Sequence, residues 1–318
     1  MHKSPLVAVL IATYNGEAFL KQQLDSILNQ TYSNIKIYIS DDNSSDTTVQ
    51  IIENYKEKFP DKIFYTLNKS NVGVVKNFEN LIFNCQEEYM ALSDQDDIWQ
   101  VNKLKKQMDA MLELESENIS LPCLVNSDLS MIDEKEQMTH QSYFKFRNYV
   151  LSDKRDLGHI LGPSGIMGNT LLMNKRFKHS TLPFPDALDR HDYWLGLHAE
   201  LFGKRKTIQE QLVQYRIHND NISNSKSIIK KNKMSIKRDI KLPNMETNRK
   251  LFLPKLIGRI TSKEDLKTVN AYIDYLKFNK NRLSLYCDLI YFSLVKKSLL
   301  FRMKLLLKLL FTNRYNKV

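Results

Sequence analysis

Residues 6–16 read LVAVLIATYNG, an unbroken apolar run that ends in a polar turn. An apolar run of this length, bounded by a turn, predicts a β-strand that is buried on both faces. The run is too short for the apolar core of a secretory signal with a cleavage site, so we expect no export signal here. A strand of this kind requires paired strands and covering helices on either side.

Apolar, β-rich runs alternate with helical patterns after this first turn. Further strands are expected at residues 35–40, 63–67, 89–93 and 121–126, and helices at residues 17–29, 46–58, 74–84 and 101–114. The alternation predicts an α/β fold whose mostly parallel central sheet is flanked by helices. In such sheets ligands bind beyond the carboxyl ends of the strands. Neither GxxxxGK(S/T) nor GxGxxG occurs, which argues against a P-loop or a dinucleotide-binding fold.

The composition supports a globular protein in a reducing compartment. A chain of 318 residues, 42% of them apolar, can build one large α/β domain with an appendage. Its cysteines, Cys85, Cys123 and Cys287, are far apart and form no CxxC pair, so they support neither a disulfide framework nor a structural zinc site.

The formal charge of +11 is divided unevenly along the chain. Residues 1–225 contain 24 Lys/Arg and 30 Asp/Glu, whereas residues 226–318 contain 23 and 6, so the two parts carry −6 and +17. We place a domain boundary there, beside the polar segment at residues 219–232. The basic part suggests lipid head groups or nucleic acid as a partner, with a solvated basic face as the alternative. Its aromatic residues are not interleaved with Lys/Arg in a stacking pattern, which argues against nucleic acid.

The end of the basic part carries a helical pattern at residues 286–311. This segment is rich in Leu and Phe but is interrupted by Lys and Arg, so no uncharged run approaches the ~18 residues of a membrane-spanning helix. Lys297, Lys304 and Lys308 share one helical face, which favours an amphipathic helix lying in a membrane interface. The alternative is a helix that docks on the body with its lysines in water.

Three carboxylates follow the expected strand at residues 89–93. Asp94, Asp96 and Asp97 would repel one another unless a cation neutralised them. A hard divalent ion such as Mg²⁺ or Mn²⁺ takes oxygen ligands, including those of a substrate diphosphate. The pattern predicts a metal and diphosphate site, and an acidic cluster that caps the next helix is the structural alternative.

A second acidic turn, Asp41-Asp42-Asn43-Ser44-Ser45-Asp46, follows the expected strand at residues 35–40. An Asp at a strand end can accept a hydrogen bond from a pyrimidine N3 proton, which predicts a nucleotide-binding carboxylate. Ser45 or Asp46 would cap the next helix. A phospho-acceptor receiver domain also has paired Asp residues after a strand, but such domains are far shorter than this body.

A third group, His191-Asp192-Tyr193-Trp194, opens a helical run that extends to Phe202. Aromatic neighbours at a helix start can partly desolvate Asp192, which would raise its proton affinity and suit a general base. The structural alternative makes Asp192 a helix-terminal charge and the two aromatic residues core packing.

In their order along the chain, these motifs resemble the family 2 glycosyltransferases with the GT-A fold, over roughly residues 5–225. Residues 9–16 look like that family's first strand and nucleotide-contacting turn, and Gln30-Thr31-Tyr32 resembles the end of its first helix. Asn71-Val72-Gly73 is similar to its NxG element. Residues 93–99, SDQDDIW, look like the DxD motif typical of rhamnosyltransferases of bacterial rhamnan and O-antigen synthesis, and the group at Asp192 resembles their (E/H)D region.

The resemblance implies a role for each of several residues. It implies nucleotide contacts from Thr13, Tyr14, Asn15, Asp41, Asp42, Asn71, Gly73 and Asp94, contacts to Mn²⁺ or Mg²⁺ from Asp96 and His218, a general base in Asp192, and a sugar or acceptor side formed by Trp99, Gly165, His191 and Trp194. The glycine-rich stretch at residues 162–168 is expected to be a flexible loop near the acceptor, and it departs from the form typical of the subgroup.

The protein implied by this resemblance has a GT-A catalytic domain at residues 1–225 and a basic, helical, membrane-associating extension at residues 226–318. It would be an inverting, metal-dependent glycosyltransferase that moves L-rhamnose from dTDP-rhamnose to a glycan acceptor, lipid-linked, in cell-surface polysaccharide synthesis. A UDP-hexose donor and a non-catalytic sugar-nucleotide-binding protein are the alternatives. We expect it to lie in the cytoplasm, peripherally on the inner face of the cell membrane, with no nucleic-acid partner.

Overall fold

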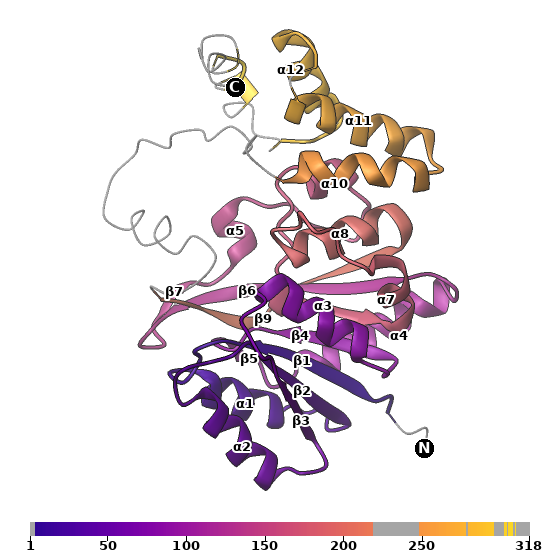
Figure 1. The fold of residues 1–318 in the computed structure, drawn as a ribbon. Coiled ribbons are helices and arrows are strands. Elements are labelled where there is room, and N and C mark those ends of the chain that lie inside the picture. Colours follow the sequence, from indigo (N-terminus) through magenta and orange to yellow (C-terminus); the bar gives the residue numbers. More distant parts are fainter. Residues whose placement is uncertain are drawn as a thin grey trace.

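Strands and helices alternate through the first part of the chain. The computed structural model describes residues 4–218, 248–277 and 279–295, with residues 302, 303, 305–307 and 309; the expected boundary segment at 219–232 lies outside these ranges. In chain order the first elements are β1 (Val7–Thr13), α1 (Leu20–Leu28), β2 (Ile35–Asp41), α2 (Thr48–Lys58), β3 (Ile63–Leu67), α3 (Val74–Asn84) and β4 (Tyr89–Ser93). The four strands pair in parallel in the order β3-β2-β1-β4 (Figure 1).

The chain reverses its direction across the sheet at β1. Strands β2 and β3 lie on one side of β1, whereas β4 pairs with β1 on the other side after the crossover through α3. Ligands in α/β sheets bind at such a switch point, beyond the carboxyl ends of the two diverging strands. The turns at residues 13–16 and 94–97 follow these two ends and are therefore neighbours.

The second half of the sheet is mixed. Its elements are β5 (Ile98–Trp99), α4 (Lys103–Glu117), β6 (Cys123–Asp133), β7 (Met138–His140), α5 (Tyr143–Arg147), α6 (Leu157–Leu161), the 3₁₀ turn η1 (Gly168–Thr170), β8 (Leu172–Asn174), α7 (Lys175–Thr181), α8 (His191–Phe202) and β9 (Lys204–Ile217). Strand β8 is antiparallel to β4 and β6, and β9 is parallel to β6 but antiparallel to β5. The parallel arrangement expected from the sequence therefore holds for β1 to β4 and gives way to mixed parallel and antiparallel pairing beyond them.

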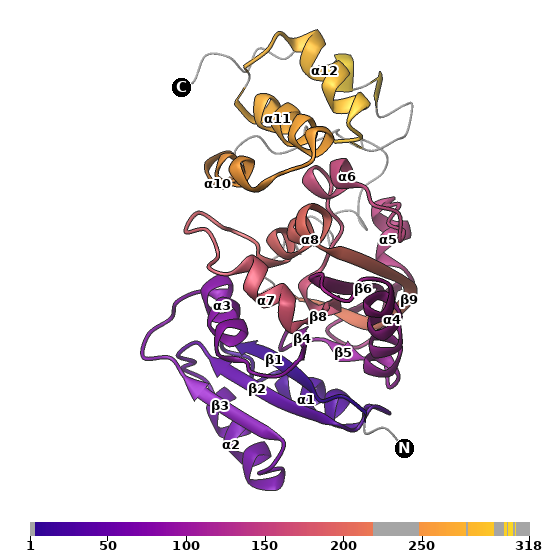
Figure 2. The ribbon, with the colours of Figure 1, turned by 90° about the vertical axis from the view of Figure 1, so that its right-hand side faces the viewer.

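Helices cover both faces of the sheet, because successive residues of a strand point to opposite sides. Val7, Val9 and Ile11 of β1 belong to one core with α1, α2 and α4, whereas Ala8 and Leu10 belong to a second core with α3, α7 and α8. Figures 1 and 2 show α1 and α2 on one face of the sheet and α3 and α8 on the other. The unbroken apolar run of β1 is buried on both sides, as its sequence predicts.

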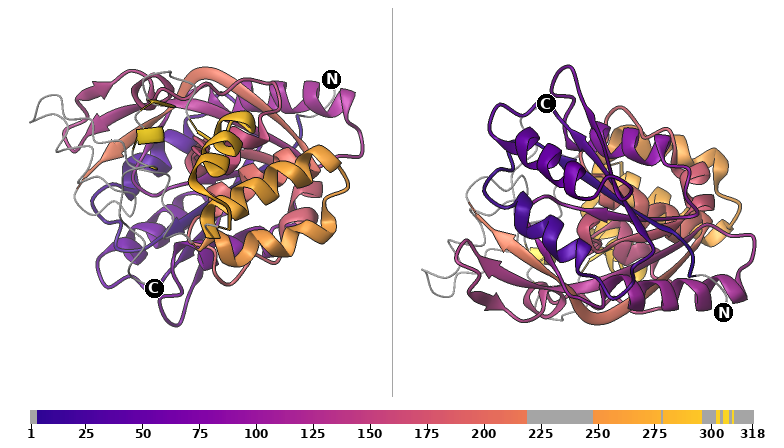
Figure 3. Two further views of the ribbon diagram at one scale, coloured as in Figure 1. Left: turned by 90° about the horizontal axis from the view of Figure 1, so that it is seen from above. Right: turned by 90° about the horizontal axis from the view of Figure 1, so that it is seen from below.

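Among the described residues, three C-terminal helices form a cap over α6 and α8. They are α10 (Arg249–Leu256), α11 (Lys263–Lys277) and α12 (Arg282–Tyr291), with the 3₁₀ turn η2 (Ile257–Arg259) after α10. Seen from above, the cap overlies the body (Figure 3, left). The rings of Phe252 and Trp194 meet at 5.6 Å, and buried side chains of all three helices belong to the same core as α8.

The amphipathic helix expected at residues 286–311 falls partly outside the described residues, and so do the lysines of its basic face. In the part that is described, Leu305 and Leu309 are buried in the core that contains α8, whereas Met303 and Leu307 are more than half exposed. Across the described ranges, no helix is both long enough and apolar enough to cross a membrane. One side of this segment therefore docks on the body, and the other presents apolar side chains to solvent.

Candidate active site

The side chain of Gln95 joins the turns that follow β1 and β4. Its Oε1 accepts a hydrogen bond from the Tyr14 amide (2.8 Å), and its Nε2 donates to the Tyr14 carbonyl (3.0 Å). Gly16 leaves room for this bridge, because a Cβ there would lie 2.4 Å from Gln95 Oε1. The Tyr14 ring is 48% exposed, so it can stack on a planar ligand above the bridge.

Asp41 is an internal anchor at the end of β2. Its carboxylate accepts hydrogen bonds from Thr13 Oγ1 (2.8 Å) and from the amide and hydroxyl of Ser44 (2.8 and 2.6 Å). Asn15 has a φ of 47°, its amide donates to Ser44 Oγ, and its Oδ1 accepts from the Ser45 amide. These contacts join the turn after β1, with Thr13 and Asn15, to the turn after β2, with Asp41. They therefore hold both turns in shape.

Asp42 connects the acidic turn to the NxG segment before α3. Its carboxylate accepts from the amides of Val72 and Gly73 (2.8 Å each) and from Asn68 Nδ2 (2.9 Å). Gly73 has a φ of 85°, a left-handed conformation that favours glycine, and its amide also donates to Asn71 Oδ1 (3.1 Å). The fold thus brings the acidic turn and the NxG segment, which are separate in sequence, to one edge of the sheet.

Asp96 and His218 meet although 122 positions separate them in the sequence. Asp96 Oδ2 is 2.8 Å from His218 Nε2, and the His218 ring lies on Phe19 at a centroid distance of 4.9 Å. Arg216, two residues earlier in β9, holds the acidic turn from behind. Its Nε donates to the Asp96 carbonyl (3.0 Å), and its amide donates to Asp97 Oδ1 (3.1 Å).

These residues fit a divalent cation that binds together with a diphosphate. Asp96 offers a carboxylate oxygen and His218 an imidazole nitrogen at the same point. In the part of the chain that the structure describes, no group of three or more His, Cys, Asp or Glu side chains could hold a metal ion by itself. Metals that bind with a phosphorylated substrate take few protein ligands and fill their other positions with phosphate oxygens and water, and a nitrogen ligand suits Mn²⁺ better than Mg²⁺.

Asp94 brings a further carboxyl group to this edge of the sheet. Burial, together with the carboxylates of Asp96 and Asp192, raises the pKa of Asp94 to about 8. Asp192 is therefore close enough to the acidic turn for the two charges to repel one another. A bound cation would oppose this effect because it stabilises the charged form of a carboxyl group.

Asp192 opens α8 and forms an ion pair with Arg190. Its Oδ2 accepts from Arg190 Nη2 (2.7 Å), and its Oδ1 accepts from the Tyr193 amide (2.6 Å). Burial alone would raise the pKa of Asp192, but the Arg190 guanidinium and these hydrogen bonds hold it below its ordinary value. The expected rise in proton affinity is therefore wrong, because Arg190 stabilises the charged form. The carboxylate is ionised at neutral pH, which a general base requires.

Three side chains that we expected on the sugar or acceptor side are buried. Trp99 and Trp194 lie in the cores on opposite faces of the sheet, and the indole of Trp194 donates to the Thr181 carbonyl (2.9 Å). His191 is buried beside Phe78 (4.3 Å between ring centroids), and burial lowers its pKa to about 4, so its ring is neutral. The two tryptophan rings are not available to a sugar, and core packing describes their positions.

The glycine-rich loop at residues 162–168 is enclosed by its neighbours. Gly165 has a φ of 90°, and a Cβ there would lie 2.9 Å from the Tyr149 ring. A Cβ on Gly162 would lie 2.0 Å from the Leu294 carbonyl. The loop that we expected to be flexible is therefore packed between the segment after α5 and the C-terminal cap, and only glycine allows these close approaches.

Residues 8–172, just over half of the chain, match the family model "Glycosyl transferase family 2". This chain belongs to glycosyl transferase family 2. Its relatives include the dTDP-rhamnosyl transferase RfbG of Shigella flexneri, which is 35% identical over 143 residues, 42% of this chain and 49% of RfbG. The putative teichuronic acid biosynthesis glycosyltransferase TuaG of Bacillus subtilis is 26% identical over 229 residues, 70% of this chain and 83% of TuaG.

The fold of this family 2 chain is also found in a solved transferase. Mannosyltransferase PcManGT from Pyrobaculum calidifontis, in complex with GDP-Man and Mn²⁺, matches with a TM-score of 0.54 and 15% identity, over 100% of this chain and 89% of that one. At this identity the likeness concerns the fold alone. It confirms the GT-A fold that the order of motifs implies. The match to RfbG spans only about half of the length of that relative.

Three side chains of this family 2 protein hold the site together although no role was predicted for them from the sequence. They are Gln95, Arg190 and Arg216. A signal existed for Arg216, because it lies two residues before His218, and alternate residues of a strand point to the same side. No local pattern indicates that Gln95 would reach Tyr14 or that Arg190 would fold back onto Asp192.

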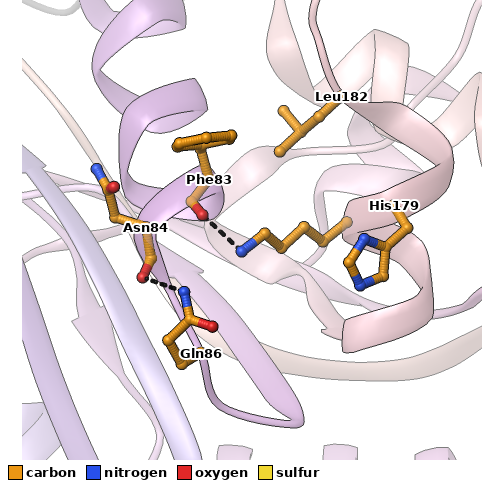
Figure 4. Close-up of a pocket in the computed structure, with 6 residues that line it drawn as sticks. Phe83, Asn84, Gln86, His179 and Leu182 are labelled. Atoms are coloured by element: carbon orange, nitrogen blue, oxygen red, sulfur yellow. Dashed lines mark hydrogen bonds between the residues drawn. The ribbon is translucent and has the colours of Figure 1, made fainter.

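A cavity of about 390 Å³ lies elsewhere in the molecule, between the end of α3 and α7 (Figure 4). It is lined by Phe83, Asn84, Gln86, Lys178, His179 and Leu182. Lys178 Nζ donates to the Phe83 and Cys85 carbonyls (2.5 and 2.8 Å) at the end of α3. Helix α3 ends just before β4 begins, so the cavity lies at the amino end of β4, opposite the acidic turn.

Proposed function

We propose that this chain is an inverting, metal-dependent glycosyltransferase that moves a sugar from a nucleotide diphosphate donor to a glycan acceptor. The observation that carries the proposal is the contact between Asp96 and His218 at the β1/β4 switch point, with Asp94 and Asp192 close enough for their charges to interact. At this point, side chains that suit a cation and a diphosphate lie beside an ionised carboxylate that suits a general base.

The donor and acceptor follow from the names of relatives. We propose dTDP-L-rhamnose as the donor, since RfbG is named a dTDP-rhamnosyl transferase, and a UDP-hexose is the alternative. The acceptor would be a growing glycan, lipid-linked, in cell-surface polysaccharide synthesis, since TuaG is named for teichuronic acid biosynthesis.

The nucleotide would lie between the turn after β1 and the NxG segment. The half-exposed Tyr14 ring would stack on the base, and Asp42, at the joint of the two segments, would accept the hydrogen bond from the base N3 proton. Thr13, Asn15 and Asp41 would keep the turn in shape, and Asn71 and Gly73 would close over the nucleotide.

The acidic turn and Asp192 would divide the chemistry between them. Asp96 and His218, with Asp94 in support, would hold Mn²⁺ or Mg²⁺, which when bound offsets the negative charge on the departing diphosphate. Asp192 would take the proton from an acceptor hydroxyl. The hydroxyl oxygen would form a bond to the anomeric carbon on the face opposite the diphosphate, and the old bond would break with its electron pair on the nucleoside diphosphate. A β-linked rhamnose donor would therefore yield an α-rhamnoside.

Nucleotide release from a panel of dTDP-, UDP- and GDP-sugars, with and without Mn²⁺, tests this proposal. We expect Mn²⁺-dependent turnover of one donor. If the protein still binds the nucleotide but turns over none of these donors, the transferase activity is rejected. That result would favour a non-catalytic sugar-nucleotide-binding protein.

We also propose that the C-terminal extension, residues 226–318, holds the protein peripherally on the inner, cytoplasmic face of an anionic membrane. The extension carries a formal charge of +17, and each basic residue near such a surface contributes about 1 kcal/mol. The exposed Met303 and Leu307 add apolar contact area on the side that does not dock on the body.

Charge substitutions test this attachment better than a deletion, which would remove the buried Leu305 and Leu309 and unfold the cap. The test variant replaces four tail lysines with Gln: Lys296, Lys297, Lys304 and Lys308. The control replaces four exposed lysines of the body: Lys21, Lys58, Lys69 and Lys105. We expect sedimentation with phosphatidylserine vesicles to fall more than tenfold for the tail variant only. Equal binding by the two variants would contradict the attachment.

A further inference from the structure

Helix α12 exposes a stripe of apolar side chains. Leu283, Cys287 and Tyr291 are spaced four residues apart and therefore lie on one helical face. Leu283 and Tyr291 are 57% and 82% exposed, and Cys287 is exposed as well. On the opposite face, Leu285 and Leu289 are fully buried in the core that contains α8. The helix thus docks on the body by one apolar face and presents a second one to solvent, which marks an interaction surface.

Contacts at both ends of α12 fix the position of this stripe. Before its start, Lys280 Nζ donates to Asp288 Oδ2 (2.9 Å) and lies 3.1 Å from Asp274 Oδ2 of α11. After its end, the backbone packs on α6 so closely that a Cβ on Gly158 would lie 1.7 Å from the Phe292 carbonyl oxygen. Only glycine allows this approach. The stripe is therefore held in one orientation relative to the body.

The charge around the stripe is positive. Residues 277–297 contain five basic residues and one acidic residue, Asp288, which is paired with Lys280. Two of the basic residues, Lys296 and Lys297, follow soon after the end of α12 in the sequence. A second copy of this chain would bring like charges together at the stripe. An apolar helical face flanked by basic residues is typical of helices that lie in the interface of an anionic membrane.

The place of α12 in the molecule suits a flat partner. Figures 1 and 2 show α12 at the end of the molecule opposite α2 and β3. A planar bilayer can reach side chains at such an outer end without meeting the rest of the body.

We propose that Leu283, Cys287 and Tyr291 insert into the interfacial region of an anionic bilayer. This inference rests on the proposed membrane attachment and goes beyond it, because charge alone would hold the protein at the surface without insertion. The Tyr291 ring combines an apolar body with a polar hydroxyl, which suits the boundary between acyl chains and head groups.

Insertion at α12 would also set the orientation of the active edge. Phe292, after α12, packs on Gly158 of α6, and the Tyr193 hydroxyl of α8 donates to the Leu161 carbonyl of α6 (3.1 Å). Asp192 precedes Tyr193 in α8. A chain of contacts through α12, α6 and α8 would therefore hold the proposed base at a constant distance from a bilayer that carries the acceptor.

A fluorescent label on Cys287 tests the insertion, because Cys85 and Cys123 are buried and Cys287 is exposed. The full chain, labelled with an environment-sensitive fluorophore, is mixed with phosphatidylserine vesicles whose acyl chains carry a nitroxide. The control combines Cys287→Ser with Ser120→Cys, which moves the label to an exposed position after α4. We expect the nitroxide to quench the Cys287 label about twofold or more and to leave the control label unchanged.

A pair of double variants measures the contribution of the stripe to binding. The test variant combines Leu283→Gln with Tyr291→Gln, and the control combines Leu112→Gln with Ile119→Gln, which are 43% and 74% exposed on the body. We expect the test variant alone to bind the vesicles about tenfold more weakly, also at high salt, where charge contributes less. Thermal unfolding, measured in parallel, reports whether each variant is folded.

The outcomes separate this inference from the attachment on which it rests. If the wild type binds the vesicles while the Cys287 label stays in water, or if the two double variants bind equally, the insertion is overturned and the attachment by charge stands. If the wild type does not bind the vesicles, both are rejected. A Cys287 label that is shielded before vesicles are added would also overturn the insertion, because another part of the chain or a second copy would then cover the stripe.

Discussion

The two acidic groups at the active edge are prepared in opposite ways. At the acidic turn, burial and neighbouring carboxylates raise the pKa of Asp94 to about 8, and Asp96 Oδ2 lies 2.8 Å from His218 Nε2. At the start of α8, Arg190 holds the pKa of Asp192 below its ordinary value. In the first group the carboxylates repel one another, and a cation arriving with the diphosphate would relieve this repulsion. The second has its counter-charge built in and is ionised before any substrate binds.

Removal of one carboxylate from each group should separate their roles and has the largest expected effects. Asp192→Asn should lower kcat for transfer about 10²–10⁴-fold, because the base is lost, while dTDP binding with Mn²⁺ stays close to that of the wild type. Asp96→Asn should lower kcat about 10²–10³-fold and also weaken the Mn²⁺-dependent part of dTDP binding. Initial rates and calorimetric titration measure the two quantities.

Asp109→Asn is the control for both variants, because Asp109 is exposed on α4 and paired with Lys105. It should match the wild type in rate and in binding. The comparison between the two acidic groups fails if Asp192→Asn and Asp96→Asn lose Mn²⁺-dependent nucleotide binding to the same extent.

Arg190→Gln should sharpen the comparison by removing the counter-charge of Asp192. Without the guanidinium, burial is no longer offset, so the pKa of Asp192 rises. Asp192 acts as a base only when deprotonated, so the acidic limb of the profile of kcat/KM for the acceptor against pH should move to higher pH. Arg176→Gln is the matched control, because the Arg176 side chain is 49% exposed, against 48% for Arg190, and also lies near a carboxylate, that of Glu115. An unchanged acidic limb would mean that Arg190 does not set the protonation of the base.

The smallest expected effect concerns the bridge between the two turns. Gly16→Ala places a Cβ 2.4 Å from Gln95 Oε1 and should displace the Gln95 side chain, which raises KM for the donor about fivefold. Gln95→Ala should have a similar effect, because it removes both hydrogen bonds to Tyr14. The double variant should be no worse than Gln95→Ala, since no side chain remains to be displaced. If the effects of Gly16→Ala and Gln95→Ala on the KM for the donor were additive in the double variant, Gly16 would act through another contact.

Local patterns predicted several elements with the bounds that the structure has. Residues 63–67, 74–84 and 89–93 are a strand, a helix and a strand, because apolar runs and helical periodicity are properties of the local sequence. Helix α1 begins at Leu20, later than expected, and the Glu17 carboxylate accepts a hydrogen bond from the Thr47 amide at the start of α2. Strand β9 was not predicted, because it is rich in charged and polar residues and exists through its pairing with β6.

Local sequence patterns predicted some features of the site and not others. Strand ends followed by Asp or Asn predicted that the turns after β1, β2 and β4 would come together, and hydrogen bonds join Thr13 to Asp41 and Tyr14 to Gln95. The sequence pattern did not reveal that Trp99 and Trp194 would turn into the two cores. Whether an aromatic side chain faces a core or a ligand depends on what the rest of the fold places against it.

By itself, the sequence determined the α/β alternation, the strand ends that carry polar turns and the order of motifs, because these follow from the periodicity and the types of adjacent residues. Only the tertiary structure decided the mixed half of the sheet, the bridge from Gln95 to Tyr14 and the ionisation of Asp192. These depend on burial and on charges brought together from distant parts of the chain, and the free energy of a carboxylate changes with such neighbours even when its own sequence does not.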